Sequence, residues 1–212
     1  MTTSIQHLIN TRTSINHFQP NRPLQESDIS LLVELATKAP TAYNMQNWHF
    51  IAVQSEEAKI QLKSAAFGQQ KIVDASIAFI ICGKLEAHQQ LSSTLEPSVK
   101  ANIIGQHVAD AWVTQAMAAH KNNDLLQRDE AIRSASLAAM SLLLAAQDMG
   151  LAAQDMGLGS CPIGGFDAAE VSRQFALSEN EIPVLIVVVG YPKELNLRQK
   201  MRKPLSEILT VI

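Results

Sequence analysis

APTAYNMQNWHFIAV, at residues 39–53, carries a helix end, a polar loop and a strand in immediate succession. Ala39 precedes a proline, and a residue in that position avoids helical backbone angles, so we expect the preceding helix to end there. Residues 40–48 are mostly polar and predict a loop. Residues 49–54 are rich in branched and aromatic side chains and predict a strand. The stretch therefore predicts a chain in which helices and strands follow one another closely.

Helical patterns flank this stretch on both sides. Ser27 is a candidate N-cap of the upstream helix, whose apolar face comprises Ile29, Leu32, Val33 and Ala36. Downstream, Ser55 stands before two glutamates, which predicts an N-cap and an acidic first turn. A short N-terminal helix is predicted from the helical spacing of Ile5, Leu8 and Ile9.

Two further strands are predicted from apolar runs, SIAFIICG at residues 76–83 and PVLIVVVGYP at residues 183–192. Residues 98–120 predict a helix. Strands that are few and scattered among helices indicate a single α+β domain over residues 1–212.

The C-terminal part adds three local signals. CPIGGF, at residues 161–166, predicts a turn, and Asp167 after it is a candidate N-cap of the next helix. The final LTVI, at residues 209–212, predicts a strand without a partner in its own sheet, which suggests exchange of this segment between two copies of the chain.

Composition places the chain among globular proteins, since hydrophobic residues make up 47% and charged residues 17% of its 212 positions. The net charge of −3 argues against a nucleic-acid partner, which a basic excess would indicate.

No apolar stretch of about 18 residues predicts a membrane helix, and the N-terminus lacks the apolar core of a secretory signal, so we expect a cytoplasmic protein. Cys82 and Cys161 stand in apolar runs and predict buried, reduced thiols.

Familiar catalytic motifs are missing from the sequence. It contains no GxxxxGK[ST] phosphate loop, no HExxH, no CxxC and no GxSxG, and its glycines lack the GxGxxG spacing of a dinucleotide fold. The six histidines are widely separated, which argues against a metal site. What remains is a set of groups that bind anions or form hydrogen bonds: Arg12, Thr13, Ser14, Thr41, Asn44, Gln46, Gln69, Lys71, Gly164, Gly165, Lys200 and Arg202.

In this order and spacing, these groups resemble the FMN-dependent nitroreductase family, in particular the oxygen-insensitive NAD(P)H nitroreductases. TRTSINHF, from residue 11, resembles the family's opening Arg-x-Ser motif. Residues 39–53 resemble its Ala-Pro-Ser-x-x-Asn-x-Gln-Pro-Trp stretch, and GLGSCPIGGFD, at residues 157–167, its Gly-Leu-Gly-x-x-x-Ile-x-Gly-Phe-Asp stretch. The strand at residues 183–192 and the following KMRKPLSEIL resemble its closing strand and basic tail. The match spans nearly the whole chain.

The resemblance implies an α+β fold with a central, mainly antiparallel sheet flanked by helices. It also implies an intertwined homodimer with one FMN at each of two interface sites. The FMN phosphate is expected to be held by Arg12, Ser14, Lys200 and Arg202, with Thr13 beside them, as suits a dianion. A wall of the flavin pocket, contributed across the dimer, is expected from Pro40, Thr41, Ala42, Asn44 and Gln46.

The resemblance assigns two further groups to the flavin ring. Lys71 is expected near the pyrimidine edge, where a positive charge stabilises the anionic reduced ring. The turn over the central ring, where a backbone N–H reaches N5, is expected to comprise Pro162, Ile163, Gly164 and Gly165.

Three residues depart from the family pattern. Asn16 stands at a flavin-binding position that often carries a basic residue, and Asn47 replaces a proline. Gly68 stands where some members carry a polar flavin contact, and both Gln69 and Gln70 remain candidates for supplying that contact.

The resemblance implies a ping-pong reaction in which NADH or NADPH delivers hydride to FMN and a small-molecule acceptor then takes two electrons. Nitroaromatics and quinones are the usual acceptors. The cofactor carries the redox chemistry, so no acid–base side chain is required, and the Gly164 backbone and Lys71 are expected to tune it. Two alternatives stay open. One is a reductase on the same scaffold acting on an enal, a semialdehyde, a pteridine or a halo-aromatic compound. The other is a flavin-binding protein with little turnover.

The heptad AAQDMGL occurs twice in succession, at residues 145–151 and 152–158. One copy suffices for the family pattern, so identity at every position indicates a tandem duplication without chemistry of its own. A long, mostly buried helix is predicted from about residue 131, after a polar connection at residues 120–130.

Seven residues turn a helix by about 700°, so an inserted heptad nearly keeps its faces. The second copy therefore either loops out or extends the helix. We expect it to extend the long central helix through about Met156, with Gly157 as the C′ residue.

Overall fold

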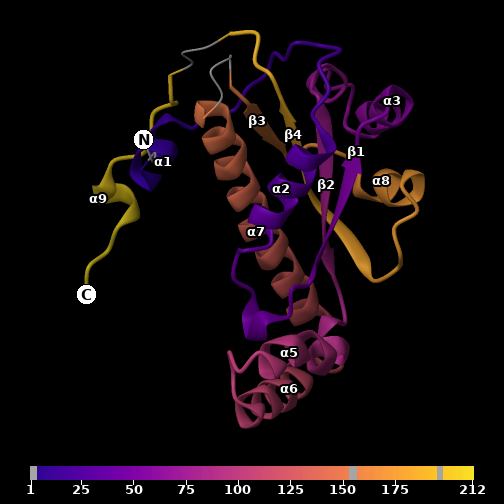
Figure 1. Ribbon diagram of the computed structural model, residues 1–212, viewed down its shortest axis with the longest axis vertical. Coiled ribbons are helices and arrows are strands. Elements are labelled where there is room, and N and C mark those ends of the chain that lie inside the picture. The colour runs from indigo at the N-terminus through magenta and orange to yellow at the C-terminus, as the bar shows by residue number, and fades with distance from the viewer. Residues whose placement is uncertain (1–3, 153–156, 195–197) are drawn as a thin grey trace.

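A computed structural model of the chain describes residues 4–152, 157–194 and 198–212. A four-stranded antiparallel sheet runs through the middle of the molecule (Figure 1). In the spatial order β1-β2-β4-β3, its strands are β1 (Trp48–Val53), β2 (Ile77–Lys84), β4 (Glu181–Gly190) and β3 (Gly159–Ile163). The predicted central antiparallel sheet is confirmed.

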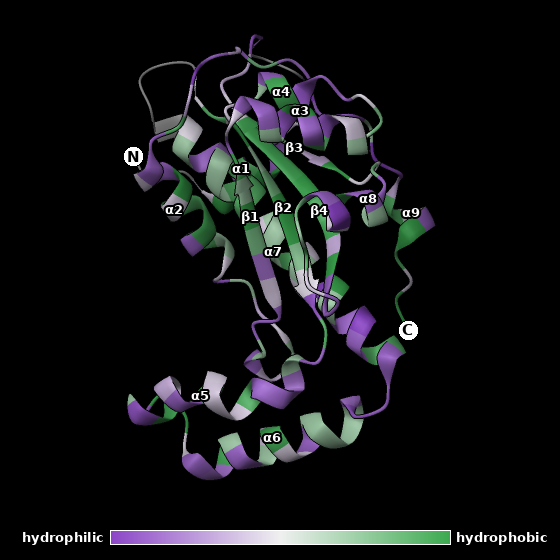
Figure 2. Ribbon diagram, turned by 90° about the vertical axis from the view of Figure 1, so that its right-hand side faces the viewer, coloured by the Kyte–Doolittle hydropathy of each residue, from purple (hydrophilic) through white to green (hydrophobic). Residues whose placement is uncertain are grey.

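The two central strands, β2 and β4, are apolar on both faces, as expected for strands that are covered on both sides. Their antiparallel register aligns Phe79 with Val187 and Ile80 with Ile186, and all of these side chains are fully buried. Figure 2 shows this hydrophobic centre running along the sheet.

Successive side chains of a strand point to opposite faces, so the sheet separates two hydrophobic layers. One face packs against α2 (Glu26–Ala36) and α7 (Asp124–Ala152), with Phe79 and Val187 in the contact. The other face packs against α3 (Glu56–Ala65), α4 (Lys71–Asp74) and α8 (Ala168–Gln174), with Ile80 and Val188 in the contact. The molecule is therefore a helix–sheet–helix sandwich (Figure 1).

A helical pair stands apart from the sandwich. α5 (Leu91–Lys100) and α6 (Gln106–His120) project beyond one end of the sheet (Figure 2). They enclose a separate small core with two 3₁₀ turns, η1 (Ala42–Asn44) and η2 (Ala87–Gln90). α1 (Ile5–Thr11) contacts α7, and the C-terminal α9 (Leu205–Ile208) lies to the side of the sheet and extends away from it in Figure 1. None of the described helices combines the length and the apolar character needed to cross a bilayer.

Several local predictions are confirmed. Ser55 accepts a hydrogen bond from the Ala58 N–H at the start of α3, and Asp167 accepts one from the Glu170 N–H at the start of α8. Both cysteines are buried free thiols. The three predicted strands are observed within two residues of their expected ends.

Three predicted helix boundaries are wrong. The helix expected at residues 98–120 is two helices, because the backbone turns at Asn102, whose φ is +56°, and α6 starts afresh after Gly105. The long helix begins at Asp124, since the Asn123 side chain accepts from the Leu126 N–H and caps it, so the expected polar connection at residues 120–130 is mostly helical. α2 begins one residue before Ser27, which therefore is not its N-cap.

The turn predicted at residues 161–166 is in part a strand. Cys161, Pro162 and Ile163 belong to β3, which pairs with β4 and is the edge strand among the four named strands, with a single bridge from Ser14 to Ser160 on its other side. An edge strand tolerates Pro162 because its missing N–H costs no second ladder bond. The predicted strand at residues 209–212 does not form within a single copy of the chain.

The prediction for the repeated heptad is wrong in one respect. The described part of α7 ends at Ala152, and the expected helical residues 153–156 lie outside the described residues. A continuous helix would place Gly150 and Gly157 about 10.5 Å apart along its axis. The two glycines are instead in backbone contact. Gly157 is therefore not one heptad further along the axis of α7, where the prediction placed it.

Candidate functional site

A small cationic pocket lies where the N-terminal segment meets the C-terminal tail. Its volume is about 180 Å³, and it is lined by Arg12, Thr13, Ser14, Asn16, Arg198, Gln199, Lys200 and Arg202. The sequence prediction brought together five of these side chains as a phosphate site and a sixth, Asn16, as a flavin contact. It missed Arg198 and Gln199, which no local motif singles out.

Gln199 joins the two parts of this pocket. Its side-chain amide donates to the carbonyl oxygens of Ile9 and Arg12, at 2.8 and 3.1 Å. These bonds attach the basic tail to the end of α1 and so fix the spacing of the cationic side chains.

One polar atom of the pocket lacks a hydrogen-bond partner among the described residues. The Nη1 of Arg12 is buried and has no hydrogen-bond partner in the described part of the chain. Leaving a charged donor buried without an acceptor is costly, so the pocket is built for an anion that accepts from it. Three more cationic side chains line the same pocket, which fits a phosphate group.

The sheet edge positions residues 12–16. Ser14 forms a parallel β-bridge with Ser160, and the Ile15 N–H donates to the Ser160 carbonyl at 3.0 Å. Gly159 allows this close approach, because a Cβ there would lie 2.5 Å from the Ile15 side chain. The pocket is therefore attached directly to β3, whose other end leads into Gly164 and Gly165.

A second cluster of polar groups adjoins the pocket through Asn16. The Lys71 ammonium donates to Asn16 Oδ1 at 3.0 Å and to Cys161 Sγ at 3.6 Å. The segments that carry Asn16, Lys71 and Cys161 are far apart in the sequence but are in contact here. Lys71 is the first residue of α4, and Cys161 lies in β3.

The two candidate glutamines are separated by the structure. The Gln69 side chain donates to the Gly165 carbonyl at 2.8 Å and so ties its loop to the turn after β3. Gln70 instead bonds to Asp74 and Lys63 on the outer side of α4. Of the two, only Gln69 lies with the other candidate residues.

The turn after β3 presents backbone, not side chains. Ile163 is buried in the core, whereas Gly164 and Gly165 are exposed. A Cβ at Gly164 would meet no atom within 4 Å, so a planar group can approach this backbone closely. Pro162 is half-buried beside it.

The loop at residues 40–46 is not joined to these segments by any hydrogen bond among the described residues. Its η1 turn packs on α5 and α6 instead. Three of its non-glycine residues have left-handed backbone angles, namely Tyr43, Asn44 and Gln46, with φ of 52°, 56° and 49°. Thr41 Oγ1 accepts from the Gln46 N–H at 3.0 Å and stabilises this shape. Such strain tends to persist at functional sites.

Beneath this loop lies a buried histidine pair. The rings of His88 and His120 stack with centroids 5.6 Å apart, and Tyr43 meets His120 edge-on at 6.5 Å. His88 Nδ1, His120 Nε2 and Asn47 Oδ1 are buried without a hydrogen-bond partner in the described part of the chain, and all three residues line one small cavity. Burial, followed by the charge of His120, lowers the pKa of His88, against a smaller raising effect of Glu86.

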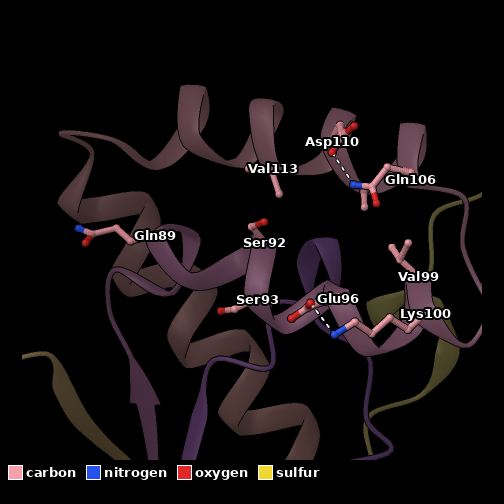
Figure 3. A pocket seen from close by; sticks show the side chains of 10 residues that line it. Gln89, Ser92, Ser93, Glu96, Val99, Lys100, Gln106, Asp110 and Val113 are labelled. Atoms are coloured by element: carbon pink, nitrogen blue, oxygen red, sulfur yellow. Dashed lines mark hydrogen bonds and ion pairs between the residues drawn. The ribbon is translucent and has the colours of Figure 1, made fainter.

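A wider groove lies elsewhere, between α5 and α6 (Figure 3). Its charged side chains are already paired along their own helices. Lys100 bonds Glu96 at 2.6 Å, and Gln106 bonds Asp110 at 2.8 Å. It contains none of the predicted site residues, so we place the candidate site at the cationic pocket and the Lys71 cluster. Among the described residues, no three His, Cys, Asp or Glu side chains are grouped to hold a metal ion.

Comparison with known proteins bears on the origin of this arrangement. A family model described as Nitroreductase family matches residues 9–191. YodC of Bacillus subtilis (strain 168), provisionally named an NAD(P)H nitroreductase, is 31% identical over 208 residues, which cover 98% of each chain. The oxygen-insensitive NAD(P)H nitroreductase of Enterobacter cloacae is 29% identical over 94% of this chain and 95% of its own.

The fold has solved counterparts as well. One is a protein of Exiguobacterium sibiricum, provisionally a nitroreductase, whose crystal structure holds FMN. It superposes with a TM-score of 0.87 at 24% identity and covers 99% of this chain and 98% of its own. The family resemblance predicted from four sequence motifs is confirmed, and the chain belongs to the nitroreductase family.

Proposed function

We propose that the chain is an FMN-dependent oxidoreductase that uses NADH or NADPH to reduce a small nitroaromatic or quinone-like acceptor. The observation that carries this proposal is the buried Arg12 Nη1, which has no partner among the described residues, in a pocket with three further cations. FMN held at this site would supply the redox chemistry, namely hydride uptake from the nicotinamide and two-electron transfer to the acceptor in a ping-pong cycle.

Each residue group has a distinct part in this proposal. Arg12, Lys200, Arg202 and the newly found Arg198 bind the phosphate, with the Thr13 and Ser14 hydroxyls beside them. The Lys71 ammonium would stabilise the negative charge that develops on the ring edge of bound FMN on reduction. The exposed Gly164 backbone N–H would donate to the central ring of bound FMN, and Gln69 holds that turn through Gly165.

A second copy of the chain completes the site in this proposal. The flavin-wall residues Pro40, Thr41, Ala42, Asn44 and Gln46 lie on a loop that one copy does not join to its own cationic pocket. Large apolar side chains are also left exposed: on α7, Leu137 is 46% and Met140 39% exposed, and in the tail Leu205 is 70% and Ile208 62% exposed. In each helix the two exposed side chains are three residues apart and so share a face, which favours an interface there. The tail residues 209–212 are available to the partner.

Three measurements test the core of the proposal. Protein purified with FMN should be yellow, should bleach anaerobically with NADH or NADPH, and should recover its colour on addition of a nitroaromatic or a quinone. Parallel lines in double-reciprocal rate plots are expected for a ping-pong cycle. A colourless protein that takes up no FMN would refute the proposal, and a yellow protein that nicotinamide cannot bleach would favour a flavin-binding role with little turnover.

The acceptor class is tested separately by comparing kcat/KM for a nitroaromatic, a quinone, an enal and a halo-aromatic compound on the same preparation. The assembly is tested by sedimentation. We expect a dimer for the full chain, and a truncation after Arg202 that removes α9 should weaken both dimerisation and FMN binding. A monomer that binds FMN fully would contradict the shared site.

A further inference from the structure

Lys71 is held by two neutral acceptors in the described part of the chain. Its ammonium donates to the Asn16 amide oxygen at 3.0 Å and to the Cys161 sulfur at 3.6 Å. The nearest acid along its helix, Asp74, already accepts from Gln70 at 2.8 Å. Among the described residues no carboxylate forms a salt bridge with Lys71, so its positive charge is held in place without being cancelled.

The position of this lysine needs an anchor. Lys71 begins α4, and a cation at a helix N-terminus gains nothing from the aligned backbone dipoles. Its side chain also has four rotatable bonds, which cost free energy to order. Asn16 and Cys161 supply two acceptors from rigid supports, since residues 14–15 are bonded to Ser160 and Cys161 lies within β3.

Cys161 is held in turn. Its thiol contacts the Pro162 carbonyl at 3.6 Å, and only 4% of the residue is exposed. The lysine, the thiol and the turn that leads to Gly164 are therefore parts of one connected arrangement. Movement of Lys71 away from this arrangement requires loss of both of its acceptors.

We infer that Asn16 and Cys161 are positioning residues, which hold the Lys71 ammonium against the bound flavin and thereby raise the flavin's reduction potential. This inference rests on the proposed function, because it concerns the same cofactor site. A neutral amide serves this purpose better than either charge would. A carboxylate at position 16 would neutralise the ammonium, and a second cation would repel it.

The test is a double-mutant cycle on the midpoint potential of bound FMN. We expect Asn16→Ala to weaken the preference for reduced over oxidised FMN about tenfold, which is about 30 mV for a two-electron couple. Asn16→Asp should lower the potential further than Asn16→Ala does. Lys71→Met should lower the potential by at least as much as Asn16→Ala. In the Lys71→Met background, Asn16→Ala should have no further effect, because Asn16 acts through the lysine.

Matched control variants distinguish an effect on the position of Lys71 from a general effect of removing a charge or a thiol. Lys63→Met removes a nearby exposed ammonium on α3 and should leave the potential unchanged. Cys161→Ala should lower it in the same direction as Asn16→Ala, whereas Cys82→Ala, at the other buried thiol, should not. An unchanged potential in Asn16→Ala, or an equal fall with and without Lys71, would overturn the inference.

A measurement on the protein without FMN tests the anchor itself. Labelling of Lys71 by acetic anhydride, followed by mass spectrometry with Lys63 as internal reference, should be faster in Asn16→Ala than in the unmodified chain. Equal rates would overturn the anchor even if FMN binds. Failure of the unmodified chain to bind FMN would instead refute the proposed function, and with it the flavin part of this inference, while the labelling result still decides the anchor.

Discussion

Gly150 and Gly157, which hold the same place in two identical heptads, lie against each other in the folded chain. A Cβ at Gly150 would lie 2.5 Å from the backbone nitrogen of Leu158, and a Cβ at Gly157 would overlap the Gly150 carbonyl. The chain thus returns at the end of the second copy to the point it had reached at the end of the first. The duplicated heptad changes the length of the sequence without displacing Leu158 from the end of α7.

Removal of one copy should therefore stabilise the protein. Gly150 already contacts Gly157 and Leu158, so deletion of residues 152–158 can rejoin the chain with little displacement. It also removes the closure entropy of a seven-residue insertion, which is about 1–2 kcal/mol. We expect the free energy of unfolding in urea to rise by about that amount, with FMN affinity unchanged. A deletion variant that is less stable or loses FMN would show that the second copy makes contacts on which the fold or the site depends.

The elements that could be predicted from sequence are those with strong local signals. The apolar runs of β2 and β4 and the caps Ser55 and Asp167 were identified because each leaves a short, direct pattern. β3 was missed because a proline at 162 and two glycines at 164 and 165 resemble a turn, and its edge position is what makes a proline acceptable there. The start of α7 was missed because polar residues after Asn123 cover one side of a helix as readily as they form a loop.

The candidate site could be predicted only where residues follow the family motifs. Arg12 and Lys200 were found in this way. The contact between Asn16 and Lys71 was not, because the two residues are 55 positions apart and each is unremarkable locally. The choice between Gln69 and Gln70 likewise needed the three-dimensional direction of the side chains.

The packing of α7 on the sheet depends on Gly83. A Cβ at this position would lie 2.7 Å from the carbonyl oxygen of Ala131, which is backbone and cannot move aside. We expect Gly83→Ala to lower the free energy of unfolding by about 1–3 kcal/mol, as overpacking does. Gly164→Ala is the matched control, because its Cβ would meet nothing within 4 Å. Equal stabilities of the two variants, measured without FMN, would contradict the close approach.

The cationic pocket predicts a specific loss of cofactor affinity. Arg12→Gln removes the charged donor whose Nη1 is buried and has no partner in the described part of the chain. A hydrogen bond from a charged group is worth about 1.5–3 kcal/mol, so FMN should bind about 10–100-fold more weakly. Arg173→Gln, on the exposed surface of α8, should leave the affinity unchanged. Titration of the apo-protein with FMN checks both, and equal affinities would place the phosphate elsewhere.

The buried pair His88 and His120 predicts a loss of stability in acid. Burial is the largest cause that lowers the pKa of His88, and the charge of His120 is the second; Glu86 acts in the opposite direction. Lys84 and Glu130 line the same cavity. A histidine in the unfolded chain has a pKa of about 6.5. Below that pH the unfolded chain binds a proton that folded His88 does not bind, so the free energy of unfolding falls as the pH falls. We expect the unfolding free energy to drop between about pH 8 and pH 5. His88→Gln should make that drop shallower, whereas His107→Gln, at an exposed histidine, should not. Identical pH profiles for His88→Gln and the unmodified chain would show that the buried pair does not control acid stability.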